Sequence, residues 1–474
     1  MSEPVSPHED LTGFQKMAAF LAVLVAFVLE VADSTIVNTA LPQIKAGLGG
    51  GQSAMQWIAA AYFLSLGSFL LIGGRLGDIY GYRRVFLSGI GAFTLASCLC
   101  GLARNAEELV AARFFQGAAG ALMAPQVMAI VQVLFTPLER VGKLAWFGVI
   151  GGLASILGPI LGGLLIEADF MGLGWRMIFL INLPIGLLAI AAAARFVPDM
   201  RQNPDQRIDY AGAALFVVAF ALLLLALIEG PELRWPAWTI ACAAAGLALV
   251  RIGWRHARGR IANGRTGIIA PDLFRLPTYG WGVAAVTVFS GAASGFLLVF
   301  AISLQQGLGL SALDTALLHV PFGFGVMGGI SLIGRHYLPR YGKWLIIAGA
   351  AVMASTGGLA LMSIAGGQPG DAGLLLLLGL AGMGMGMVMG PLPPVVMADV
   401  ERSKAGTASA MMRTAQQIGG AAGIALIGAA YFSVGQGTAA ARLEGLQPAG
   451  LVFILALIAT GMFALRLPRN IFGQ

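Results

Sequence analysis

The stretch EVADSTIVNTALP, residues 30–42, places two carboxylates, Glu30 and Asp33, inside an otherwise apolar segment. That segment, residues 17–40, is long enough to cross a bilayer as a helix. An ionisable side chain at that depth is costly, so it is expected to face a bundle interior or a watery cavity. On a helix, Glu30 and Asn38 lie on one face and Asp33 lies beside them. The pattern predicts a buried polar face, which we interpret as the coupling site of a membrane transporter.

The composition is typical of a protein that crosses the membrane many times. Of 474 residues, 58% are hydrophobic and 11% are charged, whereas globular domains carry about 25% charged residues. The 67 glycines fit the same class, because small residues let helices approach closely in lipid. Residues 1–15 contain no Lys or Arg and so lack the basic region of a secretory signal, and we expect the first helix to be retained.

We predict an all-α integral membrane protein with fourteen spans. They are centred on residues 17–40, 53–74, 84–104, 107–133, 141–166, 174–197, 210–229, 236–254, 277–304, 312–334, 343–366, 371–398, 404–434 and 447–467. Of the 29 Lys and Arg, 22 fall at the termini and in the even-numbered connections, five fall on the opposite side, and Arg113 and Arg413 lie within spans. This asymmetry predicts a multi-pass protein of the cytoplasmic (inner) membrane with both termini in the cytoplasm.

The two longest connections divide the spans into groups of six, two and six. We predict a cytoplasmic N-terminus (1–16), an N-terminal six-helix bundle (17–197), a linker with two additional central helices (198–276), a C-terminal six-helix bundle (277–467) and a cytoplasmic C-terminus (468–474). The connection at residues 74–83 recurs weakly, with a one-residue offset, at 334–343. Repeats of this kind predict two halves that hold a substrate between them near the midplane.

Several other classes of protein fit the chain poorly. The net charge of +7 lies in short loops between apolar spans, which indicates membrane orientation and no nucleic-acid partner. The basic connection 255–276 could lie on anionic lipid headgroups, although most such runs are simply solvated. The three cysteines have no metal or redox spacing, and the glycine run 382–390 follows an apolar helix and suits close packing. No catalytic arrangement is visible, so we predict neither an enzyme nor a bound metal.

Arg113 lies at a depth that matches that of Asp33. The two are roughly 10 and 13 Å from the outer ends of their spans at the helical rise. We therefore hypothesise that Arg113 and an acid of the first helix share one polar network, in which protonation of the acid releases the Arg and substrate competes for the same site. The alternative is a permanent ion pair that only fixes helix register.

The C-terminal half contributes two further ionisable candidates, His319 and Arg413. His319 could take a proton, but a lone buried His is more often a hydrogen-bonded packing residue. Arg413 has Gln416 and Gln417 at helical spacing, so its polar needs could be met locally. With Gln116 of the fourth span, His319 and Arg413 are secondary candidates.

Local motifs extend over the first six predicted spans. The first span carries Asp33, Thr35, Ile36, Val37, Asn38, Ala40, Leu41 and Pro42. The connection after the second span carries Gly74, Leu76, Asp78, Gly81, Arg83 and Arg84. The fourth span carries Leu109, Arg113, Gln116, Gly117, Ala119 and Gly120, the fifth carries Gly151, Gly158, Pro159, Gly162 and Gly163, and the sixth carries Trp175, Phe179 and Asn182. Together these residues resemble the major facilitator superfamily, and within it the fourteen-span drug:proton antiporters, which are multidrug exporters.

The resemblance implies the major facilitator fold and specific roles for two motifs. The connection after the second span resembles a cytoplasmic gating motif, in which Asp78 lies against the N-terminus of a helix that begins near Ser403 and Lys404 and holds the cytoplasmic side shut. Ile79 and Tyr82 stand where the family commonly has Arg. The fifth-span residues resemble the family's antiporter motif. By themselves they predict a bent helix with a smooth packing face.

The resemblance and the buried acids together predict a proton-coupled antiporter that exports lipophilic compounds by alternating access, without a cofactor. Glu30 and Asp33 favour cationic cargo, because a buried carboxylate attracts positive charge. The alternatives are a dedicated exporter of one antibiotic or metabolite, or of a lipid, on the same fold, whereas the fifth-span motif disfavours peptide uptake. We expect a monomer in the lipid bilayer that handles small molecules and protons, and we leave open whether a periplasmic adaptor joins it.

Overall fold

The computed structural model describes residues 12–199, 208–334, 337, 340–367, 371–401, 404–434 and 438–468. Within these ranges the regular elements are all helices. Fourteen of them are long and apolar enough to cross a membrane, which confirms the predicted number of spans and the all-α integral membrane fold. The predicted termini, 1–16 and 468–474, lie largely outside the described residues.

The N-terminal bundle contains the first six spans. They are α1 (Gly13–Leu48), α2 (Gln52–Tyr80), α3 (Tyr82–Leu102), α4 (Ala106–Leu134), α5 (Pro137–Ala168), and a last span in which the turns η1 (Phe170–Gly172) and η2 (Gly174–Arg176) lead into α6 (Met177–Leu180) and α7 (Asn182–Phe196). α1 runs beyond the predicted 17–40, because Pro42 does not end it. Proline removes one backbone hydrogen bond, a loss that membrane helices tolerate when neighbouring groups replace it.

The remaining helices form a pair and a second bundle. The pair is α8 (Tyr210–Glu232) and α9 (Ala237–Ala262), which we call the accessory hairpin. The C-terminal bundle comprises α10 (Pro277–Ile302), α11 (Ala312–Gly328), α13 (Lys343–Ala365), α14 (Ala372–Met389), α15 (Leu392–Met397), α16 (Ala405–Val434), α17 (Ala439–Glu444) and α18 (Leu446–Leu465), with the 3₁₀ helix η3 (Pro271–Arg275) and the π-helices η4 (Ser303–Gly307) and η5 (Gly329–Gly334). α8 packs against α2 of one bundle and α16 of the other.

Glycine allows the closest helix contacts within each bundle. A Cβ at Gly73 of α2 would lie 1.9 Å from the carbonyl oxygen of Ala121 in α4. A Cβ at Gly382 of α14 would likewise lie 1.9 Å from the carbonyl oxygen of Phe322 in α11. Neither position has room for a side chain, so these helix pairs approach at a distance that glycine permits. The glycine run of α14 is therefore a packing surface, as predicted.

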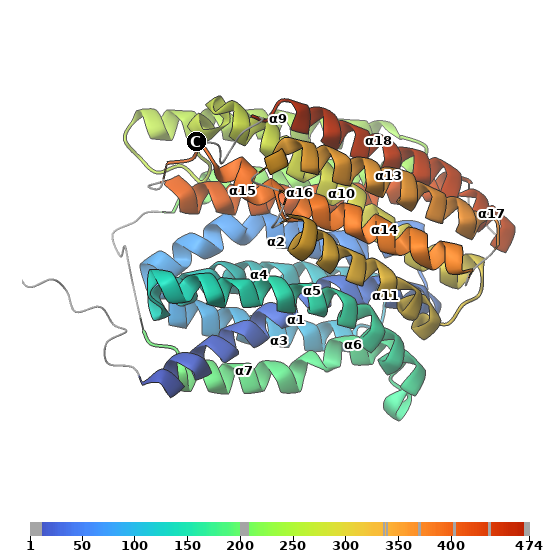
Figure 1. The fold of residues 1–474 in the computed structure, drawn as a ribbon, viewed down its shortest axis with the longest axis horizontal. Coiled ribbons are helices and arrows are strands. Elements are labelled where there is room, and N and C mark those ends of the chain that lie inside the picture. Colours follow the sequence, from blue (N-terminus) through green and yellow to red (C-terminus); the bar gives the residue numbers. More distant parts are fainter. Residues whose placement is uncertain are drawn as a thin grey trace, which may run out of the picture.

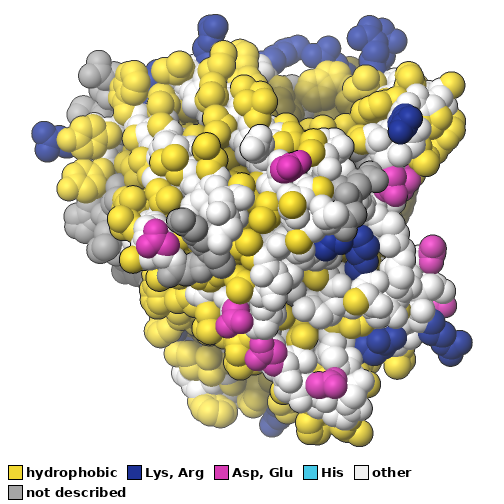
Figure 2. Space-filling model, turned by 90° about the vertical axis from the view of Figure 1, so that its right-hand side faces the viewer, with side chains coloured by type: hydrophobic (Ala, Val, Ile, Leu, Met, Phe, Trp, Pro, Cys, Tyr) yellow, Lys and Arg dark blue, Asp and Glu magenta, His cyan; other side chains and the backbone are white. Residues whose placement is uncertain are grey.

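Both described ends of the chain lie at the same end of the helices. Figure 1 shows the N-terminal bundle in the lower half, the C-terminal bundle in the upper half, and the chain ends at the left. We call this the terminal end and the opposite one the far end. Figure 2 faces the far end and shows Asp and Glu side chains scattered over it. The acids of this end include Glu107, Glu108, Glu229, Glu232 and Glu444.

Candidate functional site

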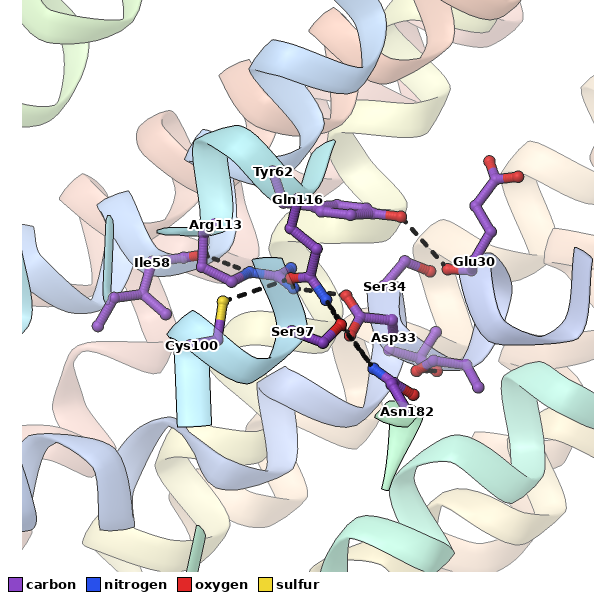
Figure 3. Close-up of polar contacts among 12 residues, drawn as sticks. Glu30, Asp33, Ser34, Ile58, Tyr62, Ser97, Cys100, Arg113, Gln116 and Asn182 are labelled. Atoms are coloured by element: carbon purple, nitrogen blue, oxygen red, sulfur yellow. Dashed lines mark hydrogen bonds and ion pairs between the residues drawn. The ribbon is translucent and has the colours of Figure 1, made fainter. Parts of the chain in front are cut away.

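Asp33 of α1 lies at the centre of a buried cluster of polar side chains (Figure 3). Its Oδ2 accepts a hydrogen bond from Nη1 of Arg113 at 2.5 Å. Its Oδ1 accepts hydrogen bonds from Nε2 of Gln116 at 2.8 Å and Nδ2 of Asn182 at 3.0 Å. Both amides also donate to Oγ of Ser97. These five residues, which we call the Asp33 network, join α1, α3, α4 and α7 of the N-terminal bundle.

Arg113 is enclosed on all sides. Its side chain is 1% exposed and that of Asp33 is 0% exposed. The guanidinium also donates to Oε1 of Gln116 and to the carbonyl oxygen of Ile58, and its Cζ lies 4.3 Å from the centre of the Tyr62 ring. A buried ion pair is tolerated when its remaining donors and acceptors are satisfied, and an aromatic face adds attraction for the cation. Because both oxygens of Asp33 have hydrogen-bond partners, the side chains of the Asp33 network hold one another in fixed positions.

The matched depths of Asp33 and Arg113 predicted this contact, and the structure confirms that the two side chains meet. Their part in transport stays a prediction. Sequence reasoning used Asn182 only as a mark of resemblance and missed Ser97. The signal for Ser97 is weak, because a single hydroxyl in a membrane helix commonly bonds to its own backbone.

A second ion pair lies one turn along α1 and connects the two bundles. Oε1 of Glu30 lies 3.6 Å from Nη2 of Arg413 on α16. The Arg413 side chain is 31% exposed and the Glu30 side chain 6%. The other carboxylate oxygen of Glu30, Oε2, is buried without a hydrogen-bond partner among the described residues. The Glu30 side chain points away from the Asp33 network in Figure 3, so this pair is a separate and less satisfied site.

The expectation that Gln416 and Gln417 satisfy Arg413 locally is therefore corrected. Arg413 instead lies against Glu30 of the other bundle. A neutral amide does not neutralise a charge, whereas a carboxylate does, so the packing of α16 against the N-terminal bundle supplies the stronger partner. The sequence could not show this pairing, because helical spacing reports only neighbours on the same helix.

Asn38 and His319 lie on a small cavity between the bundles. The cavity has a volume of about 20 Å³, is lined by residues of α1, α5, α10 and α11, and also touches Pro159 and Thr315. That volume holds about one water molecule. The His319 ring packs 5.0 Å from the ring of Phe322, which agrees with the packing interpretation of this residue. The interface between the bundles thus brings a histidine and an amide from different halves to one cavity.

The glycines of the fifth-span motif form the surface on which α5 meets α1 and α11. A Cβ at Gly158 or Gly162 would lie 2.4 or 2.7 Å from side-chain atoms of α1. A Cβ at Gly163 would lie 2.7 Å from the Cα of Leu313 in α11, which belongs to the other bundle. Pro159 lies within α5 and does not end it. The motif packs α5 against α1 of its own bundle and, at Gly163, against α11 of the other bundle, and its role in antiport stays a prediction.

The predicted gating motif forms a tight turn at the terminal end. Gly81 adopts a φ of 99°, which glycine permits, and α3 begins at the next residue. Gly74 lies in α2 beside α4. Arg83 donates to a carbonyl oxygen of α7, and Arg84 lies 3.6 Å from Asp199 after that helix. These arginines therefore fasten the turn to its own bundle.

Within the described residues, the contact recorded for Asp78 lies in its own half of the protein, and the latch stays a prediction. The carboxylate of Asp78 accepts a hydrogen bond from the hydroxyl of Tyr82 at 3.0 Å, one turn further along the chain. Lys404 at the start of α16 instead lies 2.5 Å from Asp272 of η3, while Ser403 lies outside the described residues. Tyr82, which replaces a common Arg of the family motif, is close enough to occupy the carboxylate, so the recorded contact stays within one half.

A sequence model of the family described as Major Facilitator Superfamily matches residues 23–424. The chain is 37% identical over 442 residues to the "Probable actinorhodin transporter" of Streptomyces coelicolor, covering 91% of this chain and 76% of that protein. It is 32% identical over 424 residues to the "Multidrug resistance protein Stp" of Mycobacterium tuberculosis, covering 88% and 76%.

The fold is also similar to a solved structure. The crystal structure of a bacterial homolog to the human lysosomal transporter Spinster, in an inward-facing and unoccupied conformation, superposes with a TM-score of 0.69 at 15% identity. The match covers 96% of this chain and 97% of that one. At this identity the likeness concerns the fold, and it extends over nearly the whole of both chains.

Proposed function

The chain belongs to the major facilitator superfamily, and from that membership we propose that it exports lipophilic, cationic compounds across the cytoplasmic membrane in exchange for protons. The two named relatives, an actinorhodin transporter and a multidrug resistance protein, support the export of drug-like compounds. The observation that carries the coupling to protons is the Glu30–Arg413 pair, because it connects the two bundles through a buried carboxylate and a partly exposed arginine of two membrane helices.

Alternating access separates contacts between the bundles and preserves contacts within them. The two halves of such carriers rock against each other around a site near the midplane. The Asp33 network lies within the N-terminal bundle, so rocking leaves it intact. The pair between Glu30 and Arg413 spans both bundles, so rocking breaks or forms it. The environment of Glu30 therefore changes with the conformation of the protein, whereas that of Asp33 does not.

Protonation of Glu30 weakens its ion pair with Arg413 and so favours their separation. The carboxylate attracts Arg413 only while it is ionised, and a bound proton removes that attraction. The Arg413 side chain is 31% exposed, which leaves it room to move away. A cationic compound that takes its place gains the same attraction, and a proton then displaces the compound. Proton and cargo compete for one carboxylate, which produces exchange in opposite directions.

Asp33 and Arg113 hold α1 in place beneath this site. Tyr62 connects the two sites, since its ring covers Arg113 and its hydroxyl lies 3.5 Å from the backbone oxygen of Glu30. Protonation of Asp33 would also weaken its hold on Arg113, as the sequence predicts, but Gln116 would still bond to both of them. We assign the Asp33 network a positioning role and Glu30 the exchange of proton and cargo.

The terminal end is cytoplasmic in this proposal, in line with its basic connections. Hydrogen bonds between the bundles then occur at the non-cytoplasmic end. Gln305 of η4 accepts from Nε2 of Gln43 at 2.9 Å and donates to the carbonyl oxygen of Thr39 at 2.8 Å. With the far end tied in this way, Glu30 and Arg413 would be approached from the cytoplasm, where cargo for export is found.

A dedicated exporter of one antibiotic is the second candidate, and the name of the Streptomyces coelicolor relative favours it. Such a protein would use the same bundles and the same proton exchange. The two candidates differ in how many compounds the site between the bundles accepts. A screen of cationic dyes, neutral drugs and anions separates them.

The test is transport by the purified chain in proteoliposomes with an imposed pH gradient. Wild-type protein should move cationic dyes in the direction opposite to protons, and a protonophore should stop it. Glu30→Gln should abolish dye transport that is driven by the pH gradient. Any exchange of dye that this variant still catalyses should no longer depend on pH. Glu107→Gln is the matched control, because Glu107 is an exposed acid at the far end.

Two results would contradict the proposal. Gradient-driven transport by Glu30→Gln at the wild-type rate would remove Glu30 from the coupling mechanism. Transport that requires ATP and survives a protonophore would exclude secondary antiport altogether.

A further inference from the structure

A larger cavity lies at the terminal end, where the accessory hairpin meets both bundles. Its volume is about 270 Å³, and its lining includes Leu71 of α2, Phe216 of α8, Trp254 of α9, Val283 of α10 and Ile418 of α16. Apart from three hydroxyl side chains, the lining residues are aliphatic, aromatic or methionine. The cavity is thus an apolar space, open on one side, that is lined by helices of all three parts of the chain.

Its size and depth suit a hydrocarbon chain. An apolar cavity of roughly 150 Å³ lined by Leu, Ile and Phe binds benzene, so this larger apolar space has room for a longer apolar group. Phe216, Trp254, Val283 and Met411 line it, and each lies roughly 9 to 12 Å from the terminal end of its helix at the helical rise. The cavity therefore begins close to the level at which the acyl chains of a bilayer join their headgroups.

Arginines of α9 lie beside this cavity. Arg255 and Arg258 lie between Trp254 and the terminal end of α9, and Cζ of Arg258 lies 5.6 Å from the centre of the Trp254 ring. Both arginines are exposed, and no ion pair with a carboxylate is recorded for them within the described ranges. The nearby carboxylate of Asp209 is already held by two other side chains of α9. The entrance therefore has an uncompensated positive charge.

We propose that this cavity binds an anionic phospholipid of the membrane, with an acyl chain inside it and the phosphate at the arginines of α9. The apolar lining selects a hydrocarbon chain, and the positive charge beside Trp254 selects a negative headgroup. The acyl chain of a zwitterionic lipid would also fill the cavity, but its headgroup has no net negative charge to neutralise the arginines. Because the cavity is lined by α2 and α16 as well as by the hairpin, the bound lipid fastens the accessory hairpin to both bundles.

The test measures how the purified full-length chain retains dioleoylphosphatidylglycerol and dioleoylphosphatidylcholine, using native mass spectrometry. The wild type should retain the anionic lipid more tightly. Arg258→Gln should lower that affinity about fivefold, the effect of one basic residue near an anionic surface. Arg195→Gln is the matched control, since Arg195 is an exposed arginine beside the ring of Phe196 at the same end, and it should leave retention unchanged.

A second pair of variants tests the cavity itself. Ala415→Phe places a ring in the cavity and should abolish retention of the anionic lipid, whereas Ala415→Ser should not. If Ala415→Phe fails to fold, Arg258→Gln and its control decide the question. Equal retention of the two lipids by the wild type, or unchanged retention by both Arg258→Gln and Ala415→Phe, would overturn the proposal. Loss of a cationic dye instead of the lipid from Ala415→Phe would assign the cavity to cargo and would also overturn it.

Discussion

Asp33→Asn should destabilise the protein far more than Glu30→Gln, although each variant removes one carboxylate from the same helix. Asp33→Asn leaves Arg113 charged in a site where its side chain is 1% exposed. Removing one partner of a buried ion pair costs about 3 to 5 kcal/mol. Arg113 keeps the carbonyl oxygen of Ile58 and the face of Tyr62, so we expect the lower part of that range, about 3 kcal/mol.

Glu30→Gln has a different consequence because its partner is partly solvated. The Glu30–Arg413 distance is 3.6 Å, and 31% of the Arg413 side chain is exposed. Exposed ion pairs contribute about 0 to 1 kcal/mol. The carboxylate also has one buried oxygen without a hydrogen-bond partner among the described residues, and Gln removes the charge on it. The free energy of unfolding should therefore change by no more than about 1 kcal/mol.

The assay is unfolding in mixed micelles by titration with a denaturing detergent, followed by circular dichroism. The double variant Asp33→Asn/Arg113→Gln completes a mutant cycle. It should recover most of the stability lost by Asp33→Asn alone, because no uncompensated buried charge remains. Equal losses for Asp33→Asn and Glu30→Gln, or a double variant no more stable than Asp33→Asn, would refute the argument that the enclosed Arg113 sets the cost.

Two other perturbations test the packing and the accessory hairpin. Gly73→Ala should sharply reduce the yield of folded protein in detergent, because its Cβ would lie 1.9 Å from a backbone oxygen of α4, whereas Gly91→Ala, which has no atom within 4 Å of its Cβ, should fold as the wild type does. Asp209→Asn should alter the acid dependence of thermal stability. Burial alone would raise the pKa of Asp209, but the hydrogen bond with His256, a backbone N–H and the charge of Arg260 outweigh it and hold the pKa below its usual 3.8. A carboxyl with a lowered pKa stabilises the fold above its usual pKa and loses that contribution as the pH falls through the folded value. The stability difference between wild type and Asp209→Asn should thus be constant between about pH 4 and pH 6 and shrink below about pH 4; a difference that does not vary between pH 3 and 6 would contradict this.

Patterns along the chain were enough to predict the number of spans, the helical class and the matching depth of Asp33 and Arg113. Each of these depends on local quantities, since the length of an apolar run and the rise of a helix set where a residue lies across the membrane. Motif spacing also identified the glycines of α5, whose contacts with α1 and α11 are close. The first span was predicted to stop at residue 40, whereas α1 continues through Pro42 to Leu48, because a membrane helix tolerates a proline when neighbouring groups replace the lost hydrogen bond.

The partner of each buried side chain depended on how the helices pack. Glu30 and Asp33 lie one turn apart, and the helical pattern assigned them to a single polar face. In the folded chain Asp33 turns into the N-terminal bundle and is fully satisfied there, while Glu30 turns towards Arg413 of the other bundle. Periodicity says which residues share a face but not which neighbour covers it, since that follows from the rotation of α1 against α4, α7 and α16. Only the assembled bundles could therefore distinguish an ion pair enclosed in one bundle from one that connects the two bundles.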